Sequence, residues 1–249
     1  MVRVSGERGR DAQADAVSER AALTREQIVG TAISLVDNEG VGALSMRRLG
    51  AQMGVEAMAL YRYVDGREGL LDAMVDSVTA PVESVAAGPA DSSRGGWRGY
   101  LWRLAHHMRD LAIRHPHIFP LIATRHPAAP WLRPPLRNLD MVEEFLDTLL
   151  SSGFDQHQAA TVYRGFASFL LGHLLLTAAQ EANQGKVSGG RPAPRSVQDL
   201  GDYPRIREME DLLGHSDSDA EEFAEALEDL LEVIAATAGE PDAGRVRTR

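Results

Sequence analysis

The sequence predicts an all-α protein with a small N-terminal helical domain and a larger C-terminal one. Apolar residues recur at helical spacing along most of the 249 residues, and no stretch alternates apolar with polar residues as a half-buried strand does. With 44% hydrophobic and 25% charged residues, the chain has the composition of a soluble globular protein and ample length for a core.

The cysteine count and the N-terminal segment favour a cytoplasmic protein. The chain has no cysteine, which excludes disulfides, thiolate metal sites and a cysteine nucleophile. Residues 1–22 alternate arginine with acidic residues and lack the apolar run of a signal peptide, so we expect disordered ends at 1–22 and 241–249. The most apolar stretch, 165–179, is shorter than the roughly 18 residues that a membrane span needs.

The first predicted helix begins after Thr24 and ends at the glycines Gly40 and Gly42. Thr24 and Gln27 have the spacing of a capping box, in which each side chain bonds the backbone N–H of the other residue. The apolar positions of this helix are Ile28, Ala32, Leu35 and Val36.

Two short helices follow and have the form of a helix-turn-helix. Ser45 caps the first helix, Gly54 suits a left-handed turn, and the second helix is expected from about Ala57 to Val64. Such a pair lets one helix enter a DNA major groove while the other crosses the backbone. The side chains expected to face inward are Leu49, Met53, Val55, Leu60 and Val64, and those expected to face outward are Ala57, Met58, Tyr61 and Tyr63.

The apolar spacing of the sequence after residue 64 predicts longer helices. A linking helix starts near Asp65 and Glu68, and a strongly amphipathic helix runs from Trp97 to the break at Pro116. A proline-broken segment, a helix from 136 to 153 and a helix starting at Asp155 follow. The helix after Asp155 is apolar nearly all round, so a partner subunit is expected to cover part of it. We expect a loop at 185–204 and a last helix over 223–234.

The motifs of residues 23–78 form a specific series. They are the helix end Asn38-Glu39-Gly40, then Leu44-Ser45-Met46-Arg47-Arg48-Leu49-Gly50, Gly54-Val55, Leu60-Tyr61-Arg62-Tyr63-Val64 and Arg67-Glu68-Gly69-Leu70-Leu71. In this series the segment resembles the DNA-binding domain of the TetR family of bacterial transcription regulators. The resemblance implies a helix-turn-helix domain over 23–68.

The resemblance implies a role in DNA binding for ten residues. Thr24, Arg25 and Ser45 would contact phosphates, and Arg47 would contact a guanine edge. Ala57, Met58 and Ala59 would lie at base edges. Tyr61, Tyr63 and Arg67 would clamp the DNA backbone. Without the resemblance, the alternative is that Tyr61 and Tyr63 are packing aromatics and that the arginines belong to a solvated face. Ala57 and Met58 offer no hydrogen-bond donor, so specificity is expected to use methyl contacts and DNA shape.

Residues 69–240 also resemble a known domain. The matching features are Trp97 with Tyr100-Leu101, His115-Pro116-His117, Ala123-Thr124-Arg125, Ser152-Gly153-Phe154 and Phe169-Leu170-Leu171-Gly172. They resemble the tetracycline-repressor-like C-terminal domain, which implies effector binding and dimerisation. The candidate effector-binding residues are Trp102, Leu104, Met108, Ile122, Arg125, Trp131, Leu139, Phe145, Phe166, Phe169 and His173. The alternative is that the apolar ones are ordinary core residues and that His173 is a core or interface histidine.

No metal or cofactor is expected. The tetracycline repressor binds a drug–magnesium chelate through a His and a Glu, and the corresponding positions fall near Leu121 and Leu176, which cannot ligate Mg²⁺. We therefore expect a different, more apolar effector. The histidines His106, His107, His115 and His117 show no two-histidine spacing of a metal-binding helix.

The favoured function is a ligand-responsive, sequence-specific DNA-binding regulator, with release of a repressor from a palindromic operator as its mechanism. Helices over 158–179 and 223–234 are expected to form a four-helix homodimer interface. An enzyme is not expected, because no nucleophile–base pair or pair of carboxylates stands out. The alternative is a non-enzymatic small-molecule carrier with a vestigial helix-turn-helix.

The acidic net charge of −10 is unevenly distributed. Eleven of the 36 acidic residues lie within 208–232, which contains no Lys or Arg, and outside it 26 basic residues face 25 acidic ones. Within 45–67 four arginines face only Glu56 and Asp65. The excess of acidic residues therefore lies in the C-terminal region, and the predicted helix-turn-helix carries a net positive charge.

Overall fold

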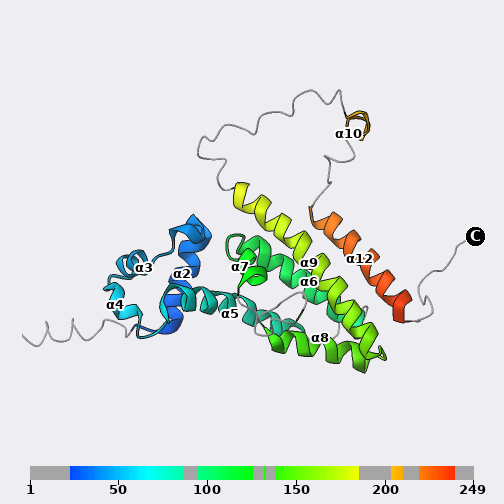
Figure 1. The fold of residues 1–249 in the computed structure, drawn as a ribbon, viewed down its shortest axis with the longest axis horizontal. Helices are drawn as coiled ribbons and strands as arrows, with labels where there is room; N and C mark the ends of the chain where they lie inside the picture. The colour runs from blue at the N-terminus through cyan, green and yellow to red at the C-terminus, as the bar shows by residue number, and fades with distance from the viewer. Residues whose placement is uncertain are drawn as a thin grey trace, which may run out of the picture.

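The fold is helical and elongated (Figure 1). The computed structural model describes residues 23–86, 95–125, 132, 138–184, 203–209 and 219–238, and within these ranges all regular secondary structure is helical. Helices α2, α3 and α4 form one end, a larger helical body forms the other, and α5 runs between them (Figure 1). The all-α prediction is confirmed. The predicted disordered segments 1–22 and 241–249 lie outside the described residues.

The N-terminal helix α2 spans Arg25–Glu39 and has the predicted capping box. The Thr24 side chain accepts the N–H of Gln27, and the Gln27 side chain accepts the N–H of Thr24. The helix ends at Gly40, whose φ of +83° is unfavourable for a residue with a side chain. A short 3₁₀ turn, η1 (Val41–Ala43), follows, and the sequence did not predict it.

Helices α3 (Met46–Met53) and α4 (Ala57–Leu60) form the helix-turn-helix. The Ser45 hydroxyl accepts the N–H of Arg48, and Gly54 takes the left-handed conformation with φ +68°, both as predicted. The expected extent of α4 to Val64 is wrong. The N–H groups of Tyr63 and Val64 both bond the Leu60 carbonyl, so the chain tightens into a turn there and leaves the helix.

Helix α5 (Gly66–Ala86) belongs to both halves of the molecule. It packs against α2 of the N-terminal domain and against α6, α7 and α8 of the C-terminal body. The predicted domain boundary between residues 68 and 69 falls in its first turn. The buried stripe that it supplies is the predicted one: Leu70, Leu71, Met74, Val75 and Val78.

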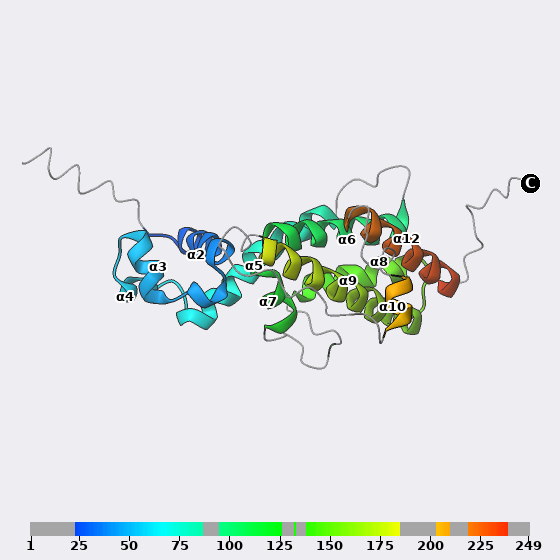
Figure 2. The same ribbon diagram turned by 90° about the horizontal axis from the view of Figure 1, so that it is seen from above.

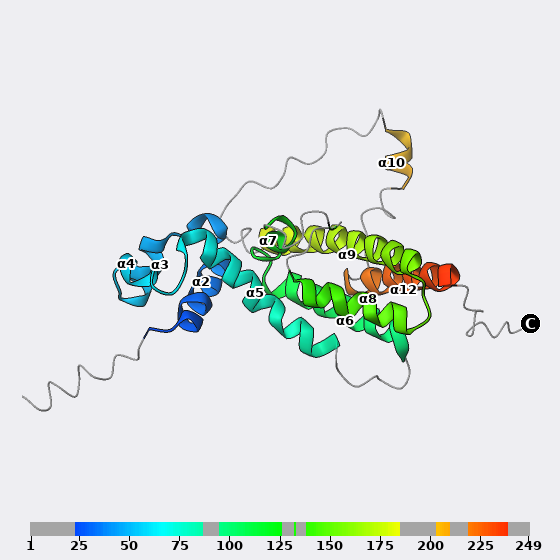
Figure 3. The ribbon, with the colours of Figure 1, turned by 60° about the horizontal axis from the view of Figure 1, so that its bottom comes forward.

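The C-terminal body is built around α9 (Gln156–Gln184), with α6 (Gly96–Arg114), α8 (Leu139–Ser151) and α12 (Asp219–Ala238) beside it (Figures 2 and 3). Short α7 (Phe119–Thr124) packs against both α9 and α5. Short α10 (Pro204–Glu208) is exposed, and most of the loop predicted at 185–204 lies outside the described residues. Asp155 and Gln158 exchange bonds at the start of α9, as predicted.

Helix α9 begins directly after Asp155, as predicted, and is apolar nearly all round. It is long enough for a membrane span, and an 18-residue window of it has a mean hydropathy of 1.3, although the most apolar stretch of the sequence, 165–179, is shorter than such a span. The core helix of a soluble protein meets the same criteria, and α9 packs against α6, α7, α8 and α12. We therefore interpret α9 as the central helix of the body.

Candidate functional site

The most exposed apolar surface of the N-terminal domain lies on α4 and the turn after it. Met58 is 73% exposed, Tyr61 49% and Tyr63 37%, although side chains of these types are usually buried. Leu60 and Val64 between them are buried and anchor the segment to the core. Ala57 and Ala59 are half-buried. The outward placement of Met58, Tyr61 and Tyr63 matches the sequence prediction.

Gly50 fixes the position of α4 on α3. A Cβ atom at Gly50 would lie 2.8 Å from the Val55 carbonyl oxygen, closer than real Cβ atoms come, and 3.1 Å from the Ala57 nitrogen, which is also a tight contact. The N–H of Val55 also bonds the Gly50 carbonyl at 2.9 Å. The two helices therefore meet backbone against backbone, and a side chain here would push α4 away.

Polar groups lie at the starts of the two preceding helices. Arg25 and Arg47 are exposed, and Arg47 has no ion pair with the described residues. The hydroxyls of Thr24 and Ser45 accept helix-capping bonds, which leaves each O–H able to donate to another acceptor. Arg48, next to Arg47, pairs instead with Glu39 of α2.

Arg67 makes hydrogen bonds within the domain that the resemblance did not imply. Its Nε donates to the Leu44 carbonyl at 3.1 Å and its Nη2 to the Val41 carbonyl at 3.2 Å. These bonds hold the turn between α2 and α3, just before the Ser45 cap. Arg67 therefore holds this turn with a side chain that is still 40% exposed, and its contact with a phosphate backbone stays a prediction.

Arg125 lies elsewhere than expected, because it joins α7 to α5 and does not face the cavity. Its Nε donates to Asp72 at 2.8 Å, its Nη2 donates to the Glu68 carbonyl at 2.9 Å, and its Nη1 pairs with the Glu68 carboxylate. The hydrogen bond from Arg125 holds the pKa of Glu68 below its ordinary value. Burial lowers the pKa of Arg125, but the bonds to Glu68 and Asp72 outweigh it and the net pKa is raised.

The two arginines form one polar chain through Glu68. Glu68 pairs with Arg125 and also with Arg67 at 3.2 Å, and Arg67 in turn holds the turn before α3. We call this chain, Arg125–Glu68–Arg67, the polar relay. It connects the end of α7 in the C-terminal body to the start of the helix-turn-helix.

A second junction links α2 to the bend between α6 and α7. The ring Nδ1 of His115 bonds the Asp37 carboxylate at 2.8 Å, and the ring Nδ1 of His117 bonds the Asp37 carbonyl at 3.1 Å. His106 bonds the Trp102 carbonyl of its own helix. Across the described part of the chain, no three His, Asp or Glu side chains are grouped as metal ligands would be.

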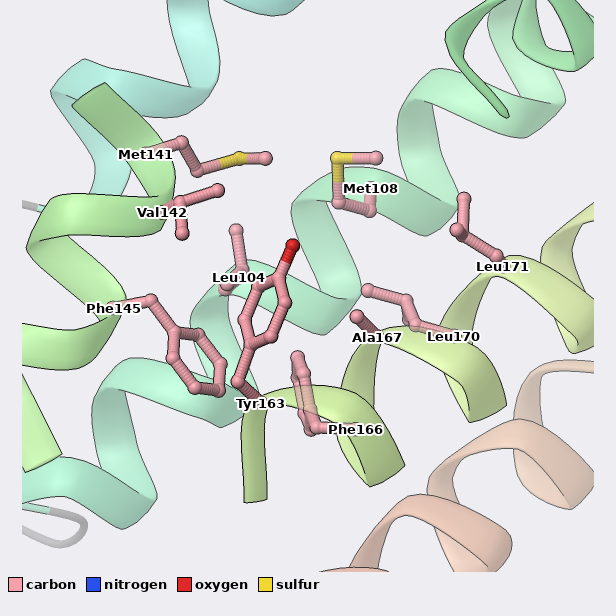
Figure 4. Close-up of a pocket in the computed structure, with 10 residues that line it drawn as sticks. All are labelled: Leu104, Met108, Met141, Val142, Phe145, Tyr163, Phe166, Ala167, Leu170 and Leu171. Atoms are coloured by element: carbon pink, nitrogen blue, oxygen red, sulfur yellow. The ribbon is translucent and has the colours of Figure 1, made fainter. Parts of the chain in front are cut away.

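A small apolar cavity of about 40 Å³ lies between α6, α8 and α9 (Figure 4). The ten side chains that line it are Leu104, Met108, Met141, Val142, Phe145, Tyr163, Phe166, Ala167, Leu170 and Leu171. Leu104, Met108, Phe145 and Phe166 are among the predicted effector residues. The other six were missed, although the helical register of Phe166 on α9 would have drawn attention to Tyr163 and Leu170.

The remaining predicted effector residues are placed elsewhere. Leu139 is 44% exposed at the start of α8, Ile122 is buried on α7, and Trp131 lies outside the described residues. Leu121 and Leu176, the positions near the tetracycline repressor's His and Glu, are also absent from the cavity wall, and Leu176 is 68% exposed.

Phe169 and His173 pack against Phe223 of α12, and Trp102 is linked to Phe223 through His106, which lies 5.5 Å from it. Trp102 stacks on His106 at 3.7 Å between ring centroids, and Phe223 lies 5.1 Å from His173 and 6.5 Å from Phe169. The guanidinium of Arg109 lies over the Phe223 ring at 5.7 Å. This cluster packs α12 onto α6 and α9 with His173 half-buried among its rings, which agrees with the alternative of a core histidine.

The chain is similar to known transcription regulators along most of its length. A family model described as the tetracyclin repressor-like C-terminal domain matches residues 89–238. HTH-type transcriptional repressor DrrR1 of Streptomyces coeruleorubidus is 45% identical over 94 residues, which are 38% of this chain and 33% of that protein. The chain is therefore matched to only a third of the length of DrrR1.

Two longer similarities extend over both domains. Tetracycline repressor protein class D of Escherichia coli is 26% identical over 213 residues, 85% of this chain and 88% of that protein. The crystal structure of a possible TetR family transcriptional regulator from Streptomyces coelicolor A3(2) matches with a TM-score of 0.68 and 29% identity, covering 85% of this chain and 98% of that one.

Proposed function

The chain belongs to the TetR family of bacterial transcription regulators, and on that premise we propose that it binds a palindromic DNA operator as a homodimer and releases it when a small, largely apolar effector binds. The similar proteins are repressors and transcriptional regulators by name, which supports this proposal. A small-molecule carrier is not favoured, because the similar proteins are transcriptional regulators by name.

The observation that carries the proposal is the outward set of side chains on the helix-turn-helix. Met58, Tyr61 and Tyr63 are exposed on a segment whose position is fixed by Gly50, and Arg47 is exposed at the start of α3. Arginine is the commonest specific partner of guanine, methyl-bearing side chains contact thymine, and tyrosine hydroxyls bind phosphates. We propose that Thr24, Arg25 and Ser45 add phosphate contacts, with Ala57 and Ala59 close to base edges.

Dimerisation is proposed through the outer faces of α9 and α12. Leu176 on α9 is 68% exposed and Val233 on α12 is 63% exposed, and Gly165 and Gly172 leave open space on the same face of α9. Two such faces brought together would bury the apolar surface and set the separation of the recognition helices near one turn of DNA. A monomeric mass in light scattering at micromolar concentration would contradict this interface.

For the response to the effector, we propose that the cavity acts on the DNA-binding domain through α7 and α5. Helix α7 packs against α9, which supplies half of the cavity wall, and the polar relay joins α7 to the turn before α3. An effector that widens the cavity would favour a different position of α7 and so shift the population of dimers away from the DNA-binding geometry.

The proposal is tested by a mobility-shift experiment with the full chain and duplexes from the region upstream of its own gene. We expect retardation at low salt, loss of the retarded species as salt rises, and loss on substitution of Arg47→Ala with Tyr61→Ala. Absence of retardation while the protein is folded and dimeric would overturn the proposal. The cytoplasm is the compartment that this function requires.

A further inference from the structure

The wall of the cavity between α6, α8 and α9 defines which molecules it can accept. Among the ten lining side chains the only oxygen is the hydroxyl of Tyr163, and none carries a charge at neutral pH. Burial raises the pKa of Tyr163 to about 12, so the phenol stays neutral and keeps its proton. An ion placed here would lose its hydration with no opposite charge to compensate, so the wall selects against charged molecules.

The aromatic side chains favour a flat ring system. Phe145 packs edge-on against Tyr163 at 5.6 Å and 80°, and lies 5.6 Å from Phe166 with an angle of 45° between the planes. Aromatic pairs gain from offset or edge-to-face contact beyond the area they bury. A planar aromatic molecule can join this cluster from the open side of the cavity and extend the same contacts.

The cavity must widen to take such a molecule, and two methionines make widening inexpensive. Its volume of about 40 Å³ holds no more than a few water-sized spheres, whereas sites for drug-sized ligands measure roughly 300–1,000 Å³. Met108 of α6 and Met141 of α8 lie on either side of the Tyr163 hydroxyl (Figure 4). Methionine is unbranched and repacks readily, so these two side chains can move aside.

We propose that the cavity binds a neutral, planar aromatic molecule with one hydrogen-bonding group, and that the Tyr163 hydroxyl orients this group while Met108 and Met141 move to admit the rings. The inference rests on the proposed function, because it names the class of effector. A phenol can accept two hydrogen bonds and donate one, so Tyr163 can bond a ligand beside its contacts within the protein.

The test uses the fluorescence of 1-aminoanthracene, a neutral planar amine, added to the full chain. We expect saturable enhancement, displacement by 2-naphthol more readily than by naphthalene, and little displacement by 2-naphthoate, which is an anion of the same size. The preference for 2-naphthol over naphthalene should be about two- to tenfold, the contribution of one neutral hydrogen bond.

Two variants place the site and assign the hydroxyl. Tyr163→Phe should abolish the preference for 2-naphthol and leave naphthalene unchanged. Tyr100→Phe is the matched control, because Tyr100 is equally buried and packs against Phe145 at 6.2 Å but does not line the cavity, and it should keep the preference. Ala167→Leu fills the cavity and should weaken binding of the probe at least tenfold while helical content is retained.

The inference and the proposed function can fail separately. No binding of the probe, unchanged binding to Ala167→Leu, a 2-naphthol preference that survives Tyr163→Phe, or equal displacement by 2-naphthoate would each overturn the inference even if DNA is bound. Conversely, the protein could bind the probe with the expected selectivity and still not retard DNA. That result would overturn the proposed function and leave the inference about the cavity standing.

Discussion

In the N-terminal domain the side chains available to a partner stand on the outside, whereas in the C-terminal domain they face inward. Met58, Tyr61 and Tyr63 are exposed on a rigidly placed short segment, and the cavity side chains such as Phe145 and Phe166 are almost fully buried. A surface of this kind fits a large, preformed partner without moving. The cavity can accept a small one only by repacking. We therefore call the exposed surface of α3 and α4 the reader, and the side chains that line the cavity between α6, α8 and α9 the sensor.

The region between them differs from both, because polar side chains link its helices in addition to the apolar stripe of α5. The polar relay and the contacts of Asp37 with His115 and His117 are directional bonds with defined partners. Directional bonds hold one arrangement and resist partial displacement, so movement of α7 either keeps or breaks them. Effector binding therefore needs side chains that can repack, whereas DNA binding needs side chains held in place. The polar contacts between the two domains must turn the repacking into a change in the position of the DNA-binding domain.

The largest effect on DNA binding and stability is expected from a substitution that displaces α4 from α3. Gly50→Ala places a methyl group 2.8 Å from the Val55 carbonyl, so α4 must shift, at a cost of roughly 3 kcal/mol and with loss of DNA binding. The control is Gly30→Ala on α2, where a Cβ meets nothing within 4 Å, and it should stabilise the domain by about 0.5–1 kcal/mol. Thermal unfolding and mobility shifts measure both, and equal behaviour of the two variants would refute the role of Gly50.

The next largest effect is expected from a substitution that breaks the polar relay between α7 and α5. Arg125→Ala leaves the carboxylates of Glu68 and Asp72 without their shared partner and should cost roughly 1–3 kcal/mol of stability, with DNA binding becoming insensitive to an effector. Arg205→Ala is the control, because Arg205 is 87% exposed and its pair with Glu208 should contribute less than about 1 kcal/mol. Denaturant unfolding reports the stability difference. A wild-type response to effector in Arg125→Ala would remove the relay from the mechanism.

A smaller effect is expected from acid. Because the pKa of Glu68 is lowered in the folded state, its contribution to stability is present above its ordinary value of 4.5 and is lost as the pH falls through the lowered value. Glu68→Gln should therefore lower the unfolding temperature at pH 7 and make little difference well below pH 4.5. Melting curves at neutral and acid pH provide the comparison, and an equal decrease at both would contradict the ion pair.

Local signals in the sequence predicted the reader well. The capping residues Thr24 and Ser45, the left-handed Gly54 and the outward side chains of α4 depend on neighbours within a few positions, and the structure has them as expected. The extent of α4 was overestimated, because apolar spacing continues through Leu60 and Val64 although the backbone has already turned. The bonds of Arg67 within the domain were not predicted, because its partners are carbonyls 23 and 26 residues earlier.

The sensor was predicted less completely, because a cavity is a property of three helices together. Leu104, Met108, Phe145 and Phe166 line it as expected, but Phe169 and His173 pack against Phe223 and Trp102 stacks on His106 instead. Periodicity shows that a side chain faces inward and does not show which neighbour it meets. Arg125 stood out in the sequence as a polar residue near apolar helices, and its partners on α5 become visible only in three dimensions.

The central claim, that α3 and α4 read a specific DNA sequence, is tested most directly by fluorescence anisotropy with two labelled duplexes. One carries the upstream site that the mobility shift identifies, and the other carries the same bases in scrambled order, both at physiological salt. We expect at least about a thousandfold preference of the full chain for the first duplex. We also expect a loss of roughly ten- to a thousandfold in affinity on combining Arg47→Ala with Tyr61→Ala. Equal affinity for the two duplexes, or unchanged affinity of the folded double variant, would contradict the claim.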